Sequence, residues 1–106
     1  MDLASWIVAL YGGQLLSAPS LESMTTANGV TTADQEDYGL GTIIENDDGS
    51  GLTLVGHYGG IVGYQTYTFY LEQQNVAVVL MSNWQQTDLR AASAHAWAAV
   101  LGIPYP

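Results

Sequence analysis

With 106 residues, ten acidic side chains and a single basic one, Arg90, the chain carries a formal net charge of −9 and is expected to form one domain, residues 1–106, around a modest core. This charge makes nucleic acids and acidic membrane surfaces poor partners, and the absence of cysteine excludes disulfides and thiolate chemistry without indicating a cellular compartment. No apolar run reaches about 18 residues and no basic segment precedes an apolar one at the N-terminus, so neither a membrane helix nor a secretion signal is predicted.

Two short helices are predicted before any strand. A glycine pair at 12–13 ends a first amphipathic segment whose apolar residues have the spacing of one helical face: Leu3, Trp6, Ile7 and Leu10. Ser17 precedes Pro19 in the pattern of a helix cap, which predicts a second helix carrying Leu21 and Met24. Residues 25–37 are polar, contain an Asn-Gly pair and are expected to form a loop.

From Tyr38 onward the apolar period changes to two, which is typical of strands. Residues 38–46 and 51–57 flank a turn-forming segment at 47–51 and are predicted to form a hairpin-like pair. Residues 64–71 alternate strictly and predict a strand with large side chains on both faces. Residues 76–82 are almost entirely apolar, so this strand is expected in the middle of the sheet, covered on both faces.

A final helix is predicted after the polar segment 83–86, with Thr87 and Asp88 at its cap and Gly102 and Pro104 at its end. One side of this helix is expected to carry Leu89, Ala92, Ala96, Trp97 and Val100, with His95 facing solvent. The three tryptophans, Trp6, Trp84 and Trp97, are expected to anchor a core or an interface. The fold class is therefore predicted to be α+β: an antiparallel sheet of about four strands with an N-terminal and a C-terminal helix packed on it.

The acidic residues concentrate at 34–37 and 45–48, where turns are expected. The simpler interpretation is a solvated, solubilising surface, and the alternative is a cation-binding or salt-adapted role. His57 and His95 have no third ligand at a suitable spacing, so no metal site is predicted.

Read in chain order, the sequence resembles the C-terminal part of the serine β-lactamase and D-alanyl-D-alanine carboxypeptidase family, in its class C type, which also includes penicillin-binding proteins and esterases. The resemblance covers nearly the whole chain and is carried by YGLG at 38–41, GHYGGIVGY at 56–64, QTYTFYLEQQNVAVVLMSN at 65–83 and the closing helix. It implies a partial β-lactamase-like fold and no cofactor. Each short motif alone would be weak, whereas their order and spacing are specific.

The resemblance places His57, Tyr58 and Gly59 at the family's Lys/His-Thr/Ser-Gly positions, on the strand that lines one wall of the active site. It implies substrate binding by these three residues and an oxyanion-hole donor in the backbone N–H of Gly60. Tyr58 departs from the family pattern, because a phenol replaces the short hydroxyl. From the residues alone, His57 is instead a polar side chain at a strand end, and the glycines relieve a bent strand.

Other catalytic elements of the family are absent from the 106 residues. The chain has no lysine, so it has no Ser-x-x-Lys motif, and no tyrosine is followed by asparagine two places on. The first hypothesis is therefore an incomplete serine hydrolase module that is inactive alone. The second is an assembly module that homodimerises or complements a separate chain carrying the nucleophile. The resemblance implies that strand 76–82 is paired on its far side by a strand from the N-terminal part of the full fold, so this chain is expected to leave an apolar strand edge. A truncated gene product without a role of its own is a third alternative.

Overall fold

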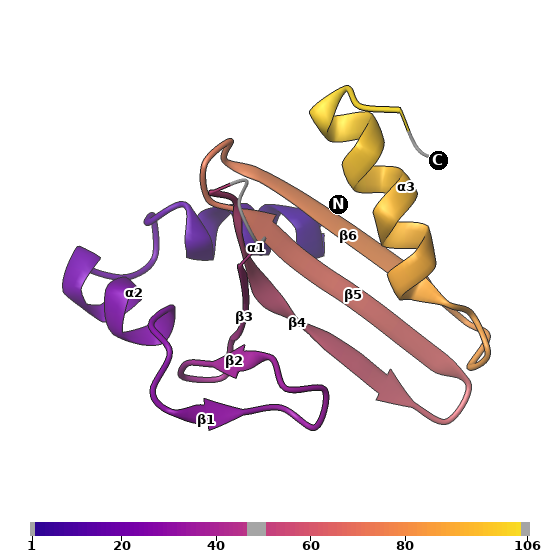
Figure 1. Cartoon of the computed structure of the whole chain (residues 1–106), viewed down its shortest axis with the longest axis horizontal. Coiled ribbons are helices and arrows are strands. Elements are labelled where there is room, and N and C mark those ends of the chain that lie inside the picture. The colour runs from indigo at the N-terminus through magenta and orange to yellow at the C-terminus, as the bar shows by residue number, and fades with distance from the viewer. Residues whose placement is uncertain (1, 47–50, 105–106) are drawn as a thin grey trace.

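The computed structural model describes residues 2–46 and 51–104 (Figure 1). Its helices and strands are, in chain order, α1 (Asp2–Tyr11), α2 (Ala18–Met24), β1 (Val30–Thr31), β2 (Asp37–Tyr38), β3 (Ile43–Asn46), β4 (Thr53–Ile61), β5 (Tyr64–Leu71), β6 (Val76–Ser82) and α3 (Leu89–Leu101). The strands form one sheet in sequential order, and every neighbouring pair is antiparallel. The predicted α+β architecture is confirmed in outline. Within the described ranges, no helix has the length and apolar character needed to span a bilayer.

The two N-terminal helix caps predicted from the sequence, at Ser17 and Asp88, are both present. The Ser17 hydroxyl accepts a hydrogen bond from the Ser20 N–H at 3.3 Å, and the Asp88 carboxylate accepts one from the Ala91 N–H at 2.9 Å. These bonds satisfy backbone donors that the first helical turn leaves without partners. Gly102 ends α3 in the left-handed conformation (φ 67°), as expected of a C-terminal glycine.

The sheet separates two apolar clusters, each covered by a terminal helix (Figure 1). On one face, α3 packs on a cluster that includes Tyr67, Phe69 and Leu71 of β5. On the other face, α1 packs on a cluster that includes Val55 and Tyr70. The alternation in residues 64–71 therefore predicted correctly which β5 side chains share a face, because successive side chains of a strand point to opposite sides.

Two predictions about the sheet are wrong. Over the described residues the sheet has six strands rather than about four, because the two-residue strands β1 and β2 fall in the expected loop and at the start of YGLG. Strands this short cannot show a periodic pattern. In addition, β6 lies at the edge of the described sheet, whereas its apolar pattern indicated the middle; the edge agrees with what the family resemblance implied. Helices α1 and α3 cover its two faces, and this coverage explains its apolar sequence without a second neighbouring strand. The predicted turn at 47–51 lies outside the described residues except for Gly51.

The tryptophans differ in burial. Trp97 is buried under α3 and its indole N–H donates to the Tyr67 hydroxyl at 2.7 Å, so it is a core residue as expected. Trp6 and Trp84 are 55% and 62% exposed, so neither is a core anchor. Within α3 the buried residues are Leu89, Ser93, Trp97 and Ala98, whereas Val100 is 38% exposed, so the expected apolar side is rotated slightly. His95 is exposed, as predicted.

Candidate functional site

Strand β4, which carries His57 to Gly60, extends beyond its neighbour β3. The pairing of β3 with β4 stops at Ile43 opposite Gly56, while β5 pairs with β4 as far as Ile61 opposite Tyr64. Among the described residues, no strand pairs with residues 57–61 on the β3 side. This part of β4 is therefore an open backbone edge inside an otherwise hydrogen-bonded sheet, and we call residues 57–61 the open edge.

Backbone alternation decides which groups of the open edge are unpaired. The Thr68 hydroxyl donates to the His57 carbonyl at 2.9 Å, and the Glu72 N–H donates to the Thr53 carbonyl at 3.2 Å. Odd-numbered residues of β4 therefore direct their backbone groups toward β5. Because successive residues of a strand alternate, the N–H and C=O groups of Tyr58 and Gly60 face the open side, where the Tyr58 carbonyl already contacts the His57 ring.

The imidazole of His57 lies exposed at the start of the open edge. Its Nδ1 contacts the backbone carbonyl oxygen of Tyr58, and its Nε2 lies 2.9 Å from the hydroxyl oxygen of Tyr38 on β2. The His57 and Tyr38 rings meet edge to face, with centroids 5.7 Å apart and an interplanar angle of 81°. The sequence singled out YGLG as a motif but gave no indication that its tyrosine reaches His57.

The Tyr58 side chain is directed away from the open edge. Its hydroxyl donates to Glu45 Oε1 at 3.0 Å. Its ring packs against Tyr67 and Phe69, with centroids 5.5 and 5.0 Å away, and the Arg90 guanidinium carbon lies 4.8 Å above its centroid. Burial, followed by the charge of Glu45, raises the pKa of the Tyr58 hydroxyl, so it remains a donor at neutral pH. The structure thus separates Tyr58 from His57, although the two residues are adjacent in sequence.

The three glycines of GHYGG differ in how much room the structure leaves for a side chain. A Cβ on Gly56 would lie 1.9 Å from the Thr68 carbonyl oxygen, so the sheet itself requires glycine there. A Cβ on Gly59 would meet the Thr66 hydroxyl at 2.4 Å. A Cβ on Gly60 would meet nothing closer than the Tyr64 carbonyl oxygen at 4.0 Å. Packing within this chain therefore does not explain Gly60, and the sequence-based account of backbone relief fails at this position.

An open hollow of about 620 Å³ adjoins the open edge. It is lined by Tyr58, Gly59, Gly60, Ile61, Val62, Gln65 and Gln85. Ile61 and Val62 are 73% and 86% exposed, which gives the hollow an apolar lip at the tip of the β4–β5 hairpin. A backbone edge next to an apolar lip is suited to an extended ligand with an apolar substituent.

A half-buried acidic pair, Glu36 and Glu45, which the sequence did not predict, lies beside the Tyr58 side chain. Burial, followed by the hydrogen bond with Glu36, raises the pKa of Glu45 to about 7, although Tyr58 and Arg90 act in the opposite direction. Burial would also raise the pKa of Glu36, but hydrogen bonds from Glu45 and Thr32 and the charge of Arg90 outweigh it and keep that pKa below its usual value. The pair therefore holds one proton, mainly on Glu45, at mildly acidic pH. The interpretation of these acids as a solvated surface is wrong for Glu36 and Glu45.

The guanidinium of Arg90 is already engaged by this cluster. Its Nη2 lies 3.4 Å from Glu36 Oε2 and 3.8 Å from Asp34 Oδ2, while its carbon stacks over Tyr58. The chain contains no other lysine or arginine. The charged groups of this cluster thus connect α3 to the segment between β1 and β2.

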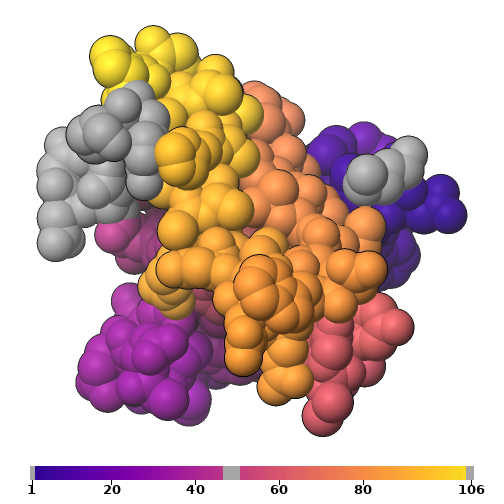
Figure 2. All heavy atoms as spheres, turned by 90° about the vertical axis from the view of Figure 1, so that its right-hand side faces the viewer, coloured from indigo at the N-terminus to yellow at the C-terminus, as the bar shows by residue number. Residues whose placement is uncertain are grey.

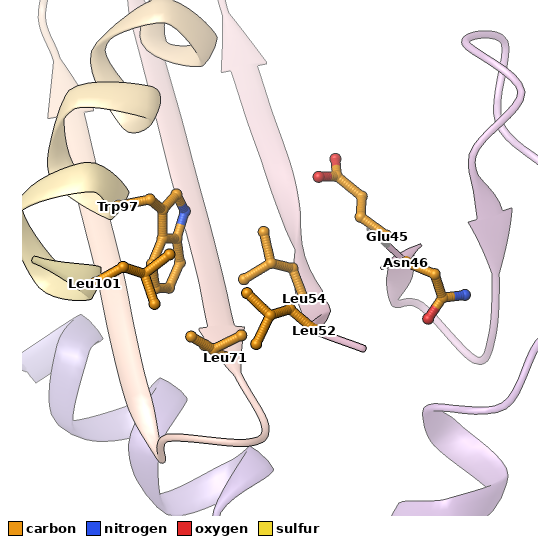
Figure 3. Close-up of a pocket in the computed structure, with 7 residues that line it drawn as sticks. All are labelled: Glu45, Asn46, Leu52, Leu54, Leu71, Trp97 and Leu101. Carbon is orange, nitrogen blue, oxygen red and sulfur yellow. The ribbon is translucent and has the colours of Figure 1, made fainter. Parts of the chain in front are cut away.

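A second hollow of about 340 Å³ lies between α3 and the opposite end of the sheet (Figure 3). Trp97 and Leu101 point from α3 toward Leu52, Leu54 and Leu71, and Glu45 and Asn46 form its polar side. None of its lining residues belongs to the open edge, so it is separate from the site around His57.

Comparison with known proteins identifies the fold family. The family profile described as Beta-lactamase matches residues 1–102. The chain belongs to the beta-lactamase family. It is 29% identical over 106 residues to penicillin-binding protein 4* of Bacillus subtilis (strain 168), and it covers 23% of that protein. The predicted family resemblance is thereby confirmed.

Solved structures of two related proteins have a similar fold. The octameric penicillin-binding protein homologue from Pyrococcus abyssi matches with a TM-score of 0.81 and 28% identity, over 96% of this chain and 24% of that one. A D-stereospecific amidohydrolase from Streptomyces sp. matches with a TM-score of 0.66 and 27% identity, over 79% of this chain and 25% of that one. The chain thus spans about a quarter of the length of these relatives.

Proposed function

We propose that this chain forms the substrate-binding wall of a serine hydrolase of the beta-lactamase family. The observation that carries the proposal is the open edge of β4, where the Gly60 N–H faces away from β5 beside a hollow of about 620 Å³. An outward N–H of this kind can donate to the oxygen of an attacked carbonyl and stabilise the negative charge that develops there. On the same strand, His57 and Gly59 act as substrate-binding residues, whereas Tyr58 contributes its backbone N–H, because its carbonyl contacts the His57 ring.

The 106 residues contain no lysine, and therefore no Ser-x-x-Lys with which to activate a serine. The nucleophile and its base must come from residues outside this sequence, either in a longer protein or in a complementing chain. Without them, only binding and one oxyanion donor remain, so we propose that these 106 residues alone do not turn over substrate.

The charges around the wall favour a neutral ester or amide as substrate. A free carboxylate requires a cation or a short hydroxyl, but Arg90 is engaged by Glu36 and Asp34, and the Tyr58 hydroxyl by Glu45. The apolar lip formed by Ile61 and Val62 suits an uncharged substituent. This preference agrees with the likeness to a D-stereospecific amidohydrolase and favours esters and amides over β-lactams.

A chimera tests the proposal. The region of the Bacillus subtilis relative that aligns with this chain would be replaced by these 106 residues, so that the relative supplies the remaining elements. We expect hydrolysis of a short-chain nitrophenyl ester that depends on the donor's serine and falls at least tenfold with His57→Ala. Tyr64→Phe, an exposed position on β5, is the matched control. A soluble, folded chimera whose ester turnover is unaffected by His57→Ala would contradict the role of the wall.

A second candidate function, assembly, is favoured by the free edge of β6. Figure 2 faces this edge and shows the atoms of β6 between those of α1 and α3. Met81 on β6 and Trp84 shortly after it are exposed apolar side chains in this region. Unpaired edges with apolar side chains invite pairing with another chain. We propose that β6 pairs with a second copy or with a complementing hydrolase chain, and a stable monomer in light scattering at high concentration would exclude the homo-oligomer.

A further inference from the structure

Both nitrogens of the His57 ring have partners, and the partners come from different parts of the sheet. Nδ1 contacts the carbonyl oxygen of the adjacent Tyr58, and Nε2 lies 2.9 Å from the Tyr38 hydroxyl, 19 residues earlier in the chain. An exposed histidine held at two points is restricted in both orientation and tautomer.

The chemistry of these partners fixes the position of the protons. A backbone carbonyl can only accept, so Nδ1 must carry the hydrogen. In the neutral ring Nε2 then has a lone pair, and the Tyr38 O–H donates to it. If the ring becomes an imidazolium, Nε2–H donates to the same phenol oxygen, because a hydroxyl can also accept. The Tyr38 hydroxyl therefore pairs with His57 in either protonation state.

The small strands explain how Tyr38 is held in place. Tyr38 pairs with Ile43 on β3 and with Val30 on β1, and its carbonyl accepts from the Asn28 N–H at 3.2 Å. Its ring also packs against the cluster under α3. The backbone that carries the phenol is thus fixed from both sides. In this arrangement, β1 and β2 extend the sheet far enough to place one hydroxyl at the start of the open edge.

We propose that Tyr38 is a positioning residue for His57. The Tyr58 carbonyl requires the Nδ1–H tautomer, and the Tyr38 hydroxyl supports it because a phenol donates to a ring nitrogen more strongly than it accepts from one. Tyr38 also aligns the ring at the start of the open edge, three residues before the Gly60 donor. The relevance of this alignment to hydrolysis rests on the proposed function, whereas the tautomer is a property of the chain itself. A substrate group that approaches the open edge therefore meets a tyrosine–imidazole pair rather than a free imidazole.

Histidine ¹⁵N spectra of the 106-residue chain at a pH where the ring is neutral test the proposal. We expect His57 to show the Nδ1–H pattern in the unmodified chain, with His95 as an internal reference. Tyr38→Phe should shift the tautomer ratio toward Nε2–H by about twofold, because the phenol pairs with either tautomer but donates to a ring nitrogen more strongly than it accepts from one. Tyr64→Phe should leave the ratio unchanged.

The outcomes separate this proposal from the proposed function. If His57 of the unmodified chain carries its hydrogen on Nε2, the positioning role is overturned. This measurement needs no variant, so it does not depend on whether Tyr38→Phe folds. The role is also overturned if a folded Tyr38→Phe variant keeps the original ratio. If the tautomer responds as expected but His57→Ala does not affect the chimera, the positioning role stands and the proposed wall fails. In an active chimera, Tyr38→Phe should lower kcat/KM, with little further loss when combined with His57→Ala.

Discussion

Replacing Glu45 with glutamine should stabilise the chain at alkaline pH while leaving its stability at acidic pH almost unchanged. The Glu45 carboxyl accepts from the Tyr58 hydroxyl at 3.0 Å, and burial followed by its interaction with Glu36 raises its pKa. Glutamine offers an oxygen to Tyr58 and an N–H to Glu36, so it reproduces the bonds of the protonated acid. Unlike the acid, it does not ionise within the half-buried cluster.

The magnitude follows from the pKa of Glu45, which rises from its ordinary value of 4.5 to about 7. A folded-state pKa above the unfolded value means that the native state binds more protons in this window. The corresponding stability is complete below about pH 4.5 and is lost as the pH rises to about 7. The full difference corresponds to about 3 kcal/mol, because one pKa unit is equivalent to about 1.4 kcal/mol. Partial solvent access and coupling to Glu36 reduce it, so we expect about 1–2 kcal/mol.

Urea unfolding followed by tryptophan fluorescence at pH 5, 6, 7 and 8 measures this effect. The stability of the unmodified chain should decline across the series, while Glu45→Gln removes most of the decline. Glu22→Gln on exposed α2 is the control and should follow the unmodified chain. Glu36 has its pKa lowered, so its stabilising effect is lost only as the pH falls toward and through that pKa, and it acts mainly below this range. Stability that is flat or rises from pH 5 to 8 would refute the shared-proton cluster.

Three further predictions concern single positions. In the chimera, Gly60→Pro removes the outward N–H and should reduce kcat about 100-fold or more. Gly60→Ala, whose methyl group has room, should keep most of the activity, and equal losses for the two variants would contradict an oxyanion role. Met81→Pro removes an N–H that faces away from β5 and should shift any oligomer toward monomer in light scattering, whereas Met81→Leu should not. Trp97→Phe loses the 2.7 Å bond to Tyr67 and buried volume, and should cost about 2 kcal/mol in urea unfolding, whereas Trp84→Phe, at a 62% exposed side chain, should cost little.

The sequence predicted those parts of the structure that depend on local pattern. Residues 64–71 alternate strictly, and the structure places β5 over the same residues, with Tyr67 and Tyr70 on opposite faces. Ser17 and Asp88 are helix caps because a short side-chain oxygen can reach the N–H three residues ahead, a local property. The apolar pattern of β6 predicted the wrong position in the sheet. A strand covered by a helix on each face has the same apolar pattern at the edge as in the middle.

The parts that could not be predicted depend on contacts between distant residues. Tyr38 reaches His57 only because the two-residue strands β1 and β2 extend the sheet beside β3. Glu45 lies near Glu36 and Arg90 through strand pairing and the packing of α3, so its acidic neighbourhood in the sequence indicated a solvated turn instead. The resemblance placed Tyr58 in the substrate wall, but strand alternation directs its side chain to the opposite face, where Glu45 accepts its hydrogen bond.

The most direct test of the central claim is the intact mass and ester turnover of the purified 106-residue chain, measured beside those of the chimera. We predict that neither a fluorescent penicillin nor a nitrophenyl ester leaves an adduct on the isolated chain. We also expect the isolated chain to turn over neither compound. The chimera should hydrolyse the ester through the donor's serine. Hydrolysis by the isolated chain that disappears when one of its own serines is replaced would contradict the account.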